Sequence, residues 1–292
     1  MPDSIRIVEV GPRDGLQNEA GQVPTAVKVA FVDALSDCGF DEIEVSSFVR
    51  PEWIPQLADA EEVFARIRRA PGVVYSALVP NERGLDRALA AGAGKVAVFT
   101  AASETFSRKN TNATIAQTLA RFRPVVARAT VPVRGYVSTA FHCPFEGPIA
   151  PAAVLAVVRA LLELGCAELS IGDTIGRATA DEVRALFEQL LSICPPDRLA
   201  AHFHDTFGQA VENARAAEAL GIRIFDSSAG GIGGCPYAPG APGNVATAAL
   251  VAAFPGRTGL DLAGLEAAAG VVGPYVKQRQ WSTVNGQREQ PQ

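Results

Sequence analysis

Short runs of β-branched and apolar residues alternate along the chain with longer helical patterns, and turn residues separate the two kinds of segment. The runs predict eight strands, at residues 5–10, 42–47, 73–79, 95–100, 131–139, 167–172, 199–204 and 222–227. Strands that alternate with helices indicate a parallel sheet, and eight such units in about 250 residues predict a single α/β domain with the (β/α)8 TIM-barrel fold. A doubly wound sheet is the alternative, but residues 11–15 (GPRDG) are not its usual glycine-rich phosphate turn.

The boundaries of the predicted helices agree with this alternation. Residues 25–38 form an amphipathic stretch whose apolar face holds Val27, Phe31, Ala34 and Leu35. Thr179 and Glu182 have the spacing of a capping box, which marks the start of another helix. Four glycines stand where a helix is expected to end with a left-handed residue: Gly39, Gly92, Gly165 and Gly221.

Composition narrows the class of protein. The 292 residues are 48% hydrophobic and carry a net charge of −5, so we do not expect nucleic-acid binding through a basic face. The sequence has no apolar run of membrane-spanning length, no signal peptide and no lipidation motif, so no membrane partner is expected. Five scattered cysteines without a C-x-x-C pair are typical of reduced thiols in a cytoplasmic protein. We expect one domain over residues 1–281 and a polar tail over 282–292.

Polar side chains occur where the predicted strands end, which is where (β/α)8 barrels carry their chemistry. They are Arg13 and Asp14 after the first strand, Glu44 in the second, Asp173 at the sixth, His202 and His204 at the seventh, and Asp226 at the eighth. The sequence therefore predicts one polar cluster at one rim of the barrel.

His202 and His204 lie two positions apart on one strand, so both imidazoles face the same side. A buried, hydrogen-bonded pair is the alternative, but a shared metal explains two such imidazoles better. Asp14 comes beside them once the barrel closes, although residues 13–15 also fit a simple turn. Two imidazoles and a carboxylate leave coordination positions open, which favours Mg²⁺ or Mn²⁺, with Zn²⁺ as the competitor.

The segment after the eighth strand, residues 229–244, contains six glycines, three prolines and Cys235. Mobile glycine-rich loops over a barrel mouth commonly act as lids, and a thiol on such a lid can exchange a proton with a substrate carbon. An incidental thiol is the alternative interpretation of Cys235. Asn244 is either the N-cap of the next helix or an amide-oxygen ligand of the metal.

Five segments in order carry a resemblance to a known family. They are 8–19 (VEVGPRDGLQNE), 44–48 (EVSSF), 171–176 (IGDTIG), 202–208 (HFHDTFG) and 233–237 (GGCPY). Together they resemble the 3-hydroxy-3-methylglutaryl-CoA (HMG-CoA) lyase family, barrel metallolyases with a pyruvate-carboxyltransferase-like domain, from about residue 5 to residue 280. The resemblance implies a lyase that splits its substrate into acetoacetate and acetyl-CoA, the chemistry of leucine degradation and ketone-body formation.

The resemblance also implies roles for individual residues. Asp14, His202, His204 and Asn244 would hold a divalent cation, and Arg13, Glu44, Asp173 and Cys235 would surround the substrate. Residues 106–110 (FSRKN), with Lys109 and Asn110, look like the family segment that approaches CoA. The expected partners are an acyl-CoA substrate and further copies of this chain in a homodimer or larger homo-oligomer.

Three of the residues that depart from the family pattern bear on the site. Ala248 and Ala249 stand where the family usually carries an acidic pair, which alters the charge near Asn244. His142 occupies a position that is expected to be small, where it either narrows the barrel mouth or caps a turn.

In the implied cleavage, Arg13 stabilises the negative charge of the departing enolate and Cys235 protonates its carbon. Asp14 and His202 are both candidate bases, and Asp173 orients the substrate or a ligand. One alternative is a Claisen-type acyl-CoA/2-oxo acid synthase of the same barrel class, but Cys235 and the chain length argue against it. Another is a lyase for a longer 3-hydroxy-3-alkylglutaryl-CoA, and His142 argues against that one. A metal-dependent amidohydrolase would carry H-x-H on its first strand, and the intact Arg13 and Cys235 argue against an inactive metal-binding protein.

Overall fold

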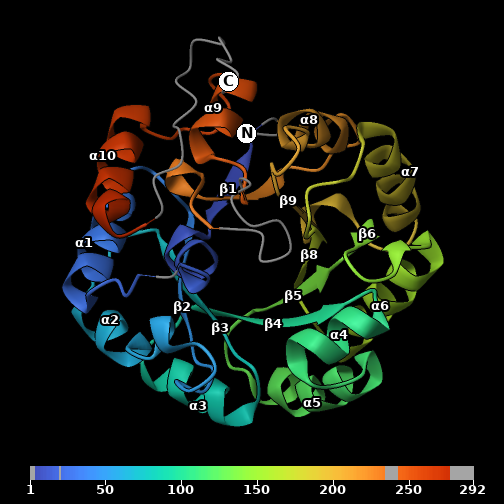
Figure 1. Ribbon diagram of the computed structural model, residues 1–292, viewed down its shortest axis with the longest axis horizontal. Helices are drawn as coiled ribbons and strands as arrows, with labels where there is room; N and C mark the ends of the chain where they lie inside the picture. The colour runs from blue at the N-terminus through green and yellow to red at the C-terminus, as the bar shows by residue number, and fades with distance from the viewer. Residues whose placement is uncertain (1–3, 20, 234–242, 277–292) are drawn as a thin grey trace.

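The computed structural model describes residues 4–19, 21–233 and 243–276. Eight parallel strands close into a barrel in the order β1-β10-β9-β8-β5-β4-β3-β2, and a ring of helices surrounds them (Figure 1). The barrel strands are β1 (Arg6–Glu9), β2 (Glu42–Ser47), β3 (Val74–Leu78), β4 (Lys95–Ala101), β5 (Val133–Ser138), β8 (Glu168–Asp173), β9 (Leu199–Phe203) and β10 (Ile224–Ser227). The predicted (β/α)8 barrel is confirmed, with every predicted strand in place to within two residues at each end.

The helices lie between the strands along the chain and cover the outside of the barrel. They are α1 (Thr25–Ser36), α2 (Ala60–Arg66), α3 (Glu82–Ala90), α4 (Glu104–Thr111), α5 (Ile115–Arg128), α6 (Pro151–Leu164), α7 (Ala180–Leu191), α8 (Ala210–Ala219), α9 (Thr247–Ala253) and α10 (Leu262–Val272). Short helical turns are η1 (Gly11–Gly15), η2 (Pro55–Leu57), η3 (Pro196–Arg198), η4 (Ala229–Gly231) and η5 (Gly273–Tyr275). The predicted boundary between residues 281 and 282 lies outside the described residues.

Local sequence signals explain several of these boundaries. Thr179 and Glu182 form the predicted capping box of α7, and the four glycines predicted to end helices all have positive φ. The buried face of α1 is turned from the predicted one, because Lys28 is buried and binds Asp59 (Nζ–Oδ1 2.7 Å) while Val27 is only partly covered.

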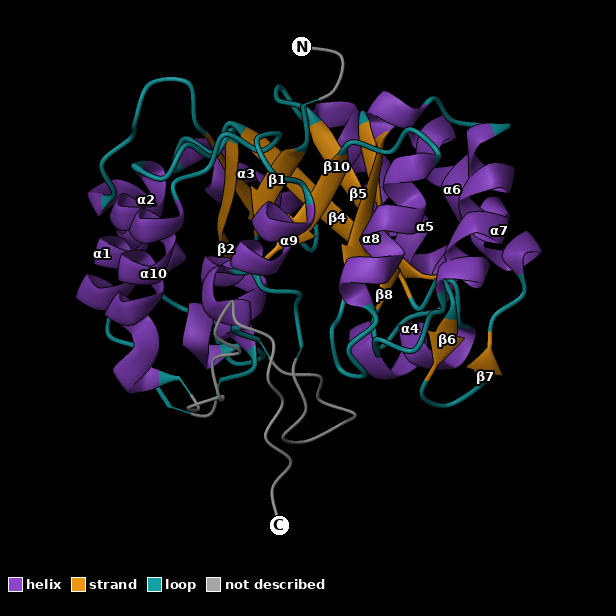
Figure 2. Ribbon diagram, turned by 90° about the horizontal axis from the view of Figure 1, so that it is seen from above, coloured by secondary structure: helices purple, strands orange, loops and turns teal. Residues whose placement is uncertain are grey.

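A two-stranded hairpin, β6 (His142–Cys143) and β7 (Gly147–Pro148), was not predicted from the sequence. It follows β5 and lies with α4 at one end of the barrel, beyond the carboxyl ends of β5 and β8 (Figure 2). Both strands have only two residues, which is too short for an alternating hydrophobic pattern to show.

The main apolar core lies between the strands and the surrounding helices. The inside of the barrel differs from the usual packing of branched apolar residues, because it contains a layer of three basic and three acidic side chains. These six residues are Arg6, Glu42, Lys95, Arg134, Glu168 and Asp226. The layer is balanced in charge and lies directly beneath the polar residues at the carboxyl ends of the strands.

Candidate active site at the carboxyl ends of the strands

Asp14, His202 and His204 form a cluster in which one ligand atom from each residue lies within 4.8 Å of the others. His202 comes from β9 and His204 follows it directly, so strand alternation turns both rings to one side, with centroids 5.3 Å apart. Asp14 lies in η1, and β1 and β9 are brought close by their shared neighbour β10. The structure therefore brings the three predicted residues together.

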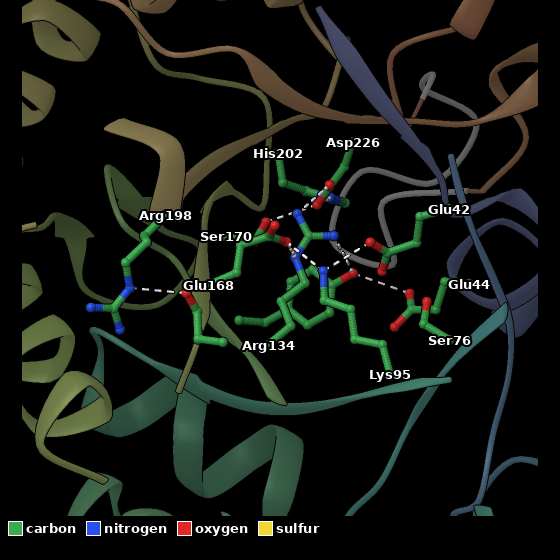
Figure 3. Close-up of polar contacts among 12 residues, drawn as sticks. Glu42, Glu44, Ser76, Lys95, Arg134, Glu168, Ser170, Arg198, His202 and Asp226 are labelled. Carbon is green, nitrogen blue, oxygen red and sulfur yellow. Dashed lines mark hydrogen bonds and ion pairs between the residues drawn. The ribbon is translucent and has the colours of Figure 1, made fainter. Parts of the chain in front are cut away.

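His202 is oriented by a carboxylate from the next strand of the barrel. Its Nδ1 lies 3.2 Å from Oδ2 of Asp226, which leaves Nε2 as the ring atom able to bind a cation. Asp226 is fully buried and also accepts hydrogen bonds from Ser170 (2.7 Å) and Arg134 (2.6 Å), as Figure 3 shows. Burial raises the pKa of Asp226, but Arg134 and His202 outweigh it and hold that pKa well below its usual range.

Below this pair lies the charged layer of the barrel interior (Figure 3). Arg134 also contacts Glu168 (3.0 Å), and Lys95 binds both Glu168 (2.9 Å) and Glu42 (2.8 Å). These side chains are buried, and each charge has a partner of opposite sign, as buried ions require. A chain of ion pairs thus links the lower barrel to His202.

Arg13 is held by two carboxylates. It donates to Glu44 Oε2 (2.6 Å) and to Asp14 Oδ1 (2.5 Å), and its guanidinium lies 5.3 Å from the ring centroid of Tyr136. Tyr136 donates its hydroxyl to the same oxygen of Glu44 (3.2 Å). Burial raises the pKa of Glu44, whereas Arg13 and the two histidines overcome burial and lower the pKa of Asp14 to about 2.

Asn244 lies beside this cluster, because its Nδ2 donates to Asp14 Oδ2 (2.8 Å). The N-cap alternative for Asn244 is wrong, since α9 begins at Thr247 and has Ala246 at its N-cap. Gly233 packs so closely here that a Cβ at that position would lie 2.7 Å from Asn244 Nδ2. Cys235 belongs to the stretch 234–242, which lies outside the described residues.

Asp173 is placed differently from the prediction. Its carboxylate accepts hydrogen bonds from the backbone amides of Arg177 (3.1 Å) and Ala178 (3.0 Å), just before α7, and it does not line the cavity described below. Burial raises its pKa to about 6 despite these two bonds. Asp173 therefore holds the loop between β8 and α7, and among the described residues nothing places its carboxylate against a substrate.

A cavity of about 800 Å³ opens at the cluster. One part of its wall is polar and includes Arg13, Asp14, His202 and His204, while another is apolar and includes Val49, Ile54, Leu78 and Phe99. Asn110 and Arg121 also line it. Lys109 packs against the ring of Phe145 (4.8 Å) at the surface, so of the two residues expected near CoA only Asn110 reaches the cavity wall. His142 binds Glu182 (3.0 Å) and does not narrow the cavity.

Sequence reasoning missed Arg134, Tyr136 and Arg121. The first two lie two positions apart on β5, and strand alternation alone would have turned both into the barrel. Their partners lie on β2, β8 and β10, far away in sequence, so the contacts themselves were not visible in the pattern.

The donor set of the cluster fits a divalent cation. A carboxylate and two imidazoles converge, one ring nitrogen is fixed by Asp226, and the amide group of Asn244 adjoins Asp14. Mixed oxygen and nitrogen donors at the carboxyl ends of the strands, with a cavity beside them, suit a cation that keeps open positions for substrate oxygens.

Comparison with known proteins gives consistent matches. The HMGL-like family model matches residues 4–272. A Pseudomonas aeruginosa protein named 3-hydroxy-3-isohexenylglutaryl-CoA/hydroxy-methylglutaryl-CoA lyase is 51% identical over 268 residues, which cover 90% of this chain and 89% of that protein. Among the described residues, none of the helices has the length and apolar character needed to cross a bilayer.

Solved structures agree with the sequence matches. The HMG-CoA lyase of Brucella melitensis superposes with a TM-score of 0.93 at 50% identity, covering 94% of this chain and all of that one. An HMG-CoA lyase from Acinetobacter baumannii, solved in complex with coenzyme A and 3-methylmalate, superposes with a TM-score of 0.90 at 36% identity and covers 100% of this chain and 99% of that one.

Proposed function

This chain belongs to the HMGL-like family of HMG-CoA lyases, and from that membership we propose that it cleaves 3-hydroxy-3-methylglutaryl-CoA to acetoacetate and acetyl-CoA. Its enzyme class is that of a carbon–carbon lyase. The observation that carries the proposal is the convergence of Asp14, His202 and His204 beside Arg13 at the cavity, because this cleavage needs both a Lewis acid and a cation for the leaving enolate.

The residues that would hold the metal are Asp14, His202, His204 and Asn244. When bound, Mg²⁺ or Mn²⁺ supplies Lewis-acid polarisation of substrate oxygens, with Zn²⁺ as the competitor. Asp226 fixes the ring of His202 for this task, and Arg13 holds the Asp14 carboxylate in place.

The proton of the tertiary hydroxyl passes to a base, for which Asp14 and His202 are the candidates, as the bond between C2 and C3 breaks. The electron pair of that bond leaves with the thioester fragment as an enolate, which then takes a proton on carbon. Arg13 is placed to stabilise the enolate oxygen, and Glu44 with Tyr136 fixes its guanidinium. We assign the proton on carbon to Cys235, which follows two positions after Gly233 in the sequence, and Gly233 itself packs against Asn244.

The coenzyme A part of the substrate would lie against Asn110 and Arg121 at the cavity wall, with Lys109 nearby on α4. A cytoplasmic location is supported by four described cysteines that are free thiols. Roles in leucine degradation and ketone-body formation, and assembly as a homodimer or larger homo-oligomer, stay predictions.

A second candidate substrate is a 3-hydroxy-3-alkylglutaryl-CoA with a longer branch. The apolar wall of Val49, Ile54, Leu78 and Phe99 favours it, as does the isohexenylglutaryl-CoA named for the Pseudomonas aeruginosa relative. His142, the expected obstacle, is bound to Glu182 away from the cavity wall.

Metal removal and two variants test the proposal, with HMG-CoA and its 3-isohexenyl analogue assayed side by side. Chelation should abolish cleavage and added Mg²⁺ or Mn²⁺ should restore it. His204→Ala should weaken Mn²⁺ binding at least about tenfold, because a ligand is lost. Arg13→Met should leave Mn²⁺ affinity close to that of the parent, since Arg13 is not a ligand and its charge acts mainly on the developing enolate, yet lower kcat about 10²-fold.

Mn²⁺ titration by calorimetry or paramagnetic resonance separates these two effects. Parent-like affinity in His204→Ala would show that the ligand assignment is wrong. Turnover by the chelated parent, or condensation of acetyl-CoA with a 2-oxo acid in place of cleavage, would contradict the proposed reaction.

A further inference from the structure

Glu9 is a buried carboxylate that the proposed chemistry does not use. It is the last residue of β1, and it pairs in register with Ser227 of β10. Arg6 points into the charged layer of the barrel, so alternation turns Glu9 to the outer side, between the barrel and the helices. Its side chain is fully buried there.

Three separate segments donate hydrogen bonds to this one carboxylate. The amide of Gly11 binds Oε1 (2.8 Å), and the amide of Ala229 binds both oxygens (2.9 and 3.0 Å). The hydroxyl of Thr247 binds Oε2 (2.9 Å). The packing around Glu9 is tight, since a Cβ at Gly11 would lie 2.5 Å from Oε1.

Each of these three segments leads into the proposed metal site. Gly11 begins η1, which carries Asp14 three residues later. Ala229 begins η4, and the chain then reaches Gly233 against Asn244. Thr247 begins α9, three residues after Asn244 itself. Asn244, itself part of the third segment, bonds the other two inside the site at Asp14 and Ile232, whereas Glu9 bonds all three from outside the barrel.

Burial of the Glu9 carboxylate between the barrel and the helices is energetically unfavourable. Among the described residues it makes no ion pair, and all its partners are neutral donors. Burial raises its pKa to about 7, although the three hydrogen bonds act in the opposite direction. An apolar residue would fill the same space between the barrel and the helices without this desolvation penalty, but it could not accept these hydrogen bonds.

We propose that Glu9 is a positioning residue, which sets the Arg13–Asp14 turn, the 229–233 segment and Asn244 in their relative places from outside the barrel. The inference rests on the proposed metal site, since that is where the three segments meet. Glu9 does not touch the proposed metal ligands. It accepts bonds from the backbone amides of Gly11 and Ala229 and from the hydroxyl of Thr247, and it thereby supports the segments that carry the ligands.

Glu9→Gln tests this directly, because glutamine keeps the shape but turns one acceptor into a donor that faces the Ala229 amide. We expect Mn²⁺ affinity to fall about tenfold. In the metal-free protein we expect faster hydrogen–deuterium exchange in all three segments together, at residues 10–16, 228–233 and 243–250. Both measurements are made well below the melting temperature of each variant.

Thr247→Val is a milder change than Glu9→Gln, because it removes only the hydroxyl that bonds Glu9. Thr118→Val is its matched control. Thr118 is an equally buried threonine whose hydroxyl bonds Thr100 (2.7 Å) and the backbone oxygen of Ile115 (2.7 Å), which lie outside the three segments. Thr247→Val should weaken Mn²⁺ binding and loosen the three segments, whereas Thr118→Val should do neither. If Glu9→Gln fails to fold, this pair of variants decides the question.

The outcomes separate the two proposals. Parent-like Mn²⁺ affinity and exchange in Glu9→Gln, or equal behaviour of the two threonine variants, would overturn the positioning role. A parent that binds no Mn²⁺ would instead refute the metal site, and the exchange of the three segments would still decide the role of Glu9.

Discussion

At the scale of single residues, Asp226 connects the charged barrel interior to the proposed metal site. It accepts hydrogen bonds from Arg134 on one oxygen and from His202 and Ser170 on the other. It therefore serves as counter-ion to a buried arginine and as the group that fixes a histidine tautomer.

Asp226→Asn should affect both roles. The loss of charge leaves Arg134 with fewer counter-ions and should cost about 3 kcal/mol of unfolding free energy. Without the carboxylate to fix Nδ1 of His202, Mn²⁺ affinity should fall about 10- to 100-fold. Urea unfolding and Mn²⁺ titration measure the two effects separately.

Ser170→Ala is the matched control, because it removes a neutral donor from the same carboxylate. It should cost about 1 kcal/mol and leave metal affinity close to that of the parent. Equal metal affinity in the two variants would reduce Asp226 to a structural counter-ion of Arg134.

These residues also show what the sequence can predict of a site. Asp14, His202 and His204 were predictable because they stand at strand ends, where the barrel directs side chains to one rim. The placement of Asp173 was not predictable, because a carboxylate at a strand end can equally turn back and accept bonds from the following loop. The Asp173 carboxylate accepts bonds from the backbone amides of Arg177 and Ala178 in this way.

At the scale of elements, the loop between β8 and α7 packs against the loop that follows β9. Gly176 has φ +68°, and a Cβ there would lie 2.7 Å from the backbone oxygen of His204 and 2.9 Å from Thr206. The strands were predictable from period-two patterns and the helices from caps, but this contact between two loops has no period along the chain. Only the three-dimensional arrangement shows it.

Gly176→Ala should therefore combine backbone strain with a steric conflict. We expect a loss of about 2–4 kcal/mol in unfolding free energy and weaker Mn²⁺ binding, since the clash falls on the backbone of His204. Gly256→Ala is the control, because Gly256 has φ +71° with open space around it, and it should cost only about 1 kcal/mol. Similar losses of unfolding free energy and of Mn²⁺ affinity in both variants would mean that the two loops adjust to the added methyl group without disturbing the site.

At the scale of the whole molecule, the buried carboxylates make stability depend on pH in opposite directions. The pKa of Asp14 is lowered to about 2, so its contribution is present above its ordinary value of 3.8 and is lost as the pH falls toward 2. The pKa of Glu9 is raised to about 7 from 4.5, so its contribution is present below pH 4.5 and is lost as the pH rises through 7.

The stability of the parent relative to Glu9→Gln should therefore fall between pH 4.5 and 7.5. A shift from 4.5 to about 7 corresponds to roughly 3 kcal/mol. Reversible urea unfolding of both metal-free proteins across this range gives the difference directly. A difference that stays constant with pH would show that Glu9 has the same pKa in the folded and the unfolded protein, which would contradict the raised pKa.

The pairing of β1 with β10 determines when the site can exist during synthesis of the chain. Asp14 and Asn244 bond to each other across 230 positions, so one partner is made 230 residues before the other. Until β10 has been made, one edge of β1 has no strand beside it, and such an edge invites pairing with other chains. The proposed cation site can therefore form only once the chain has been made as far as Asn244, because no shorter nascent form holds all four proposed ligands.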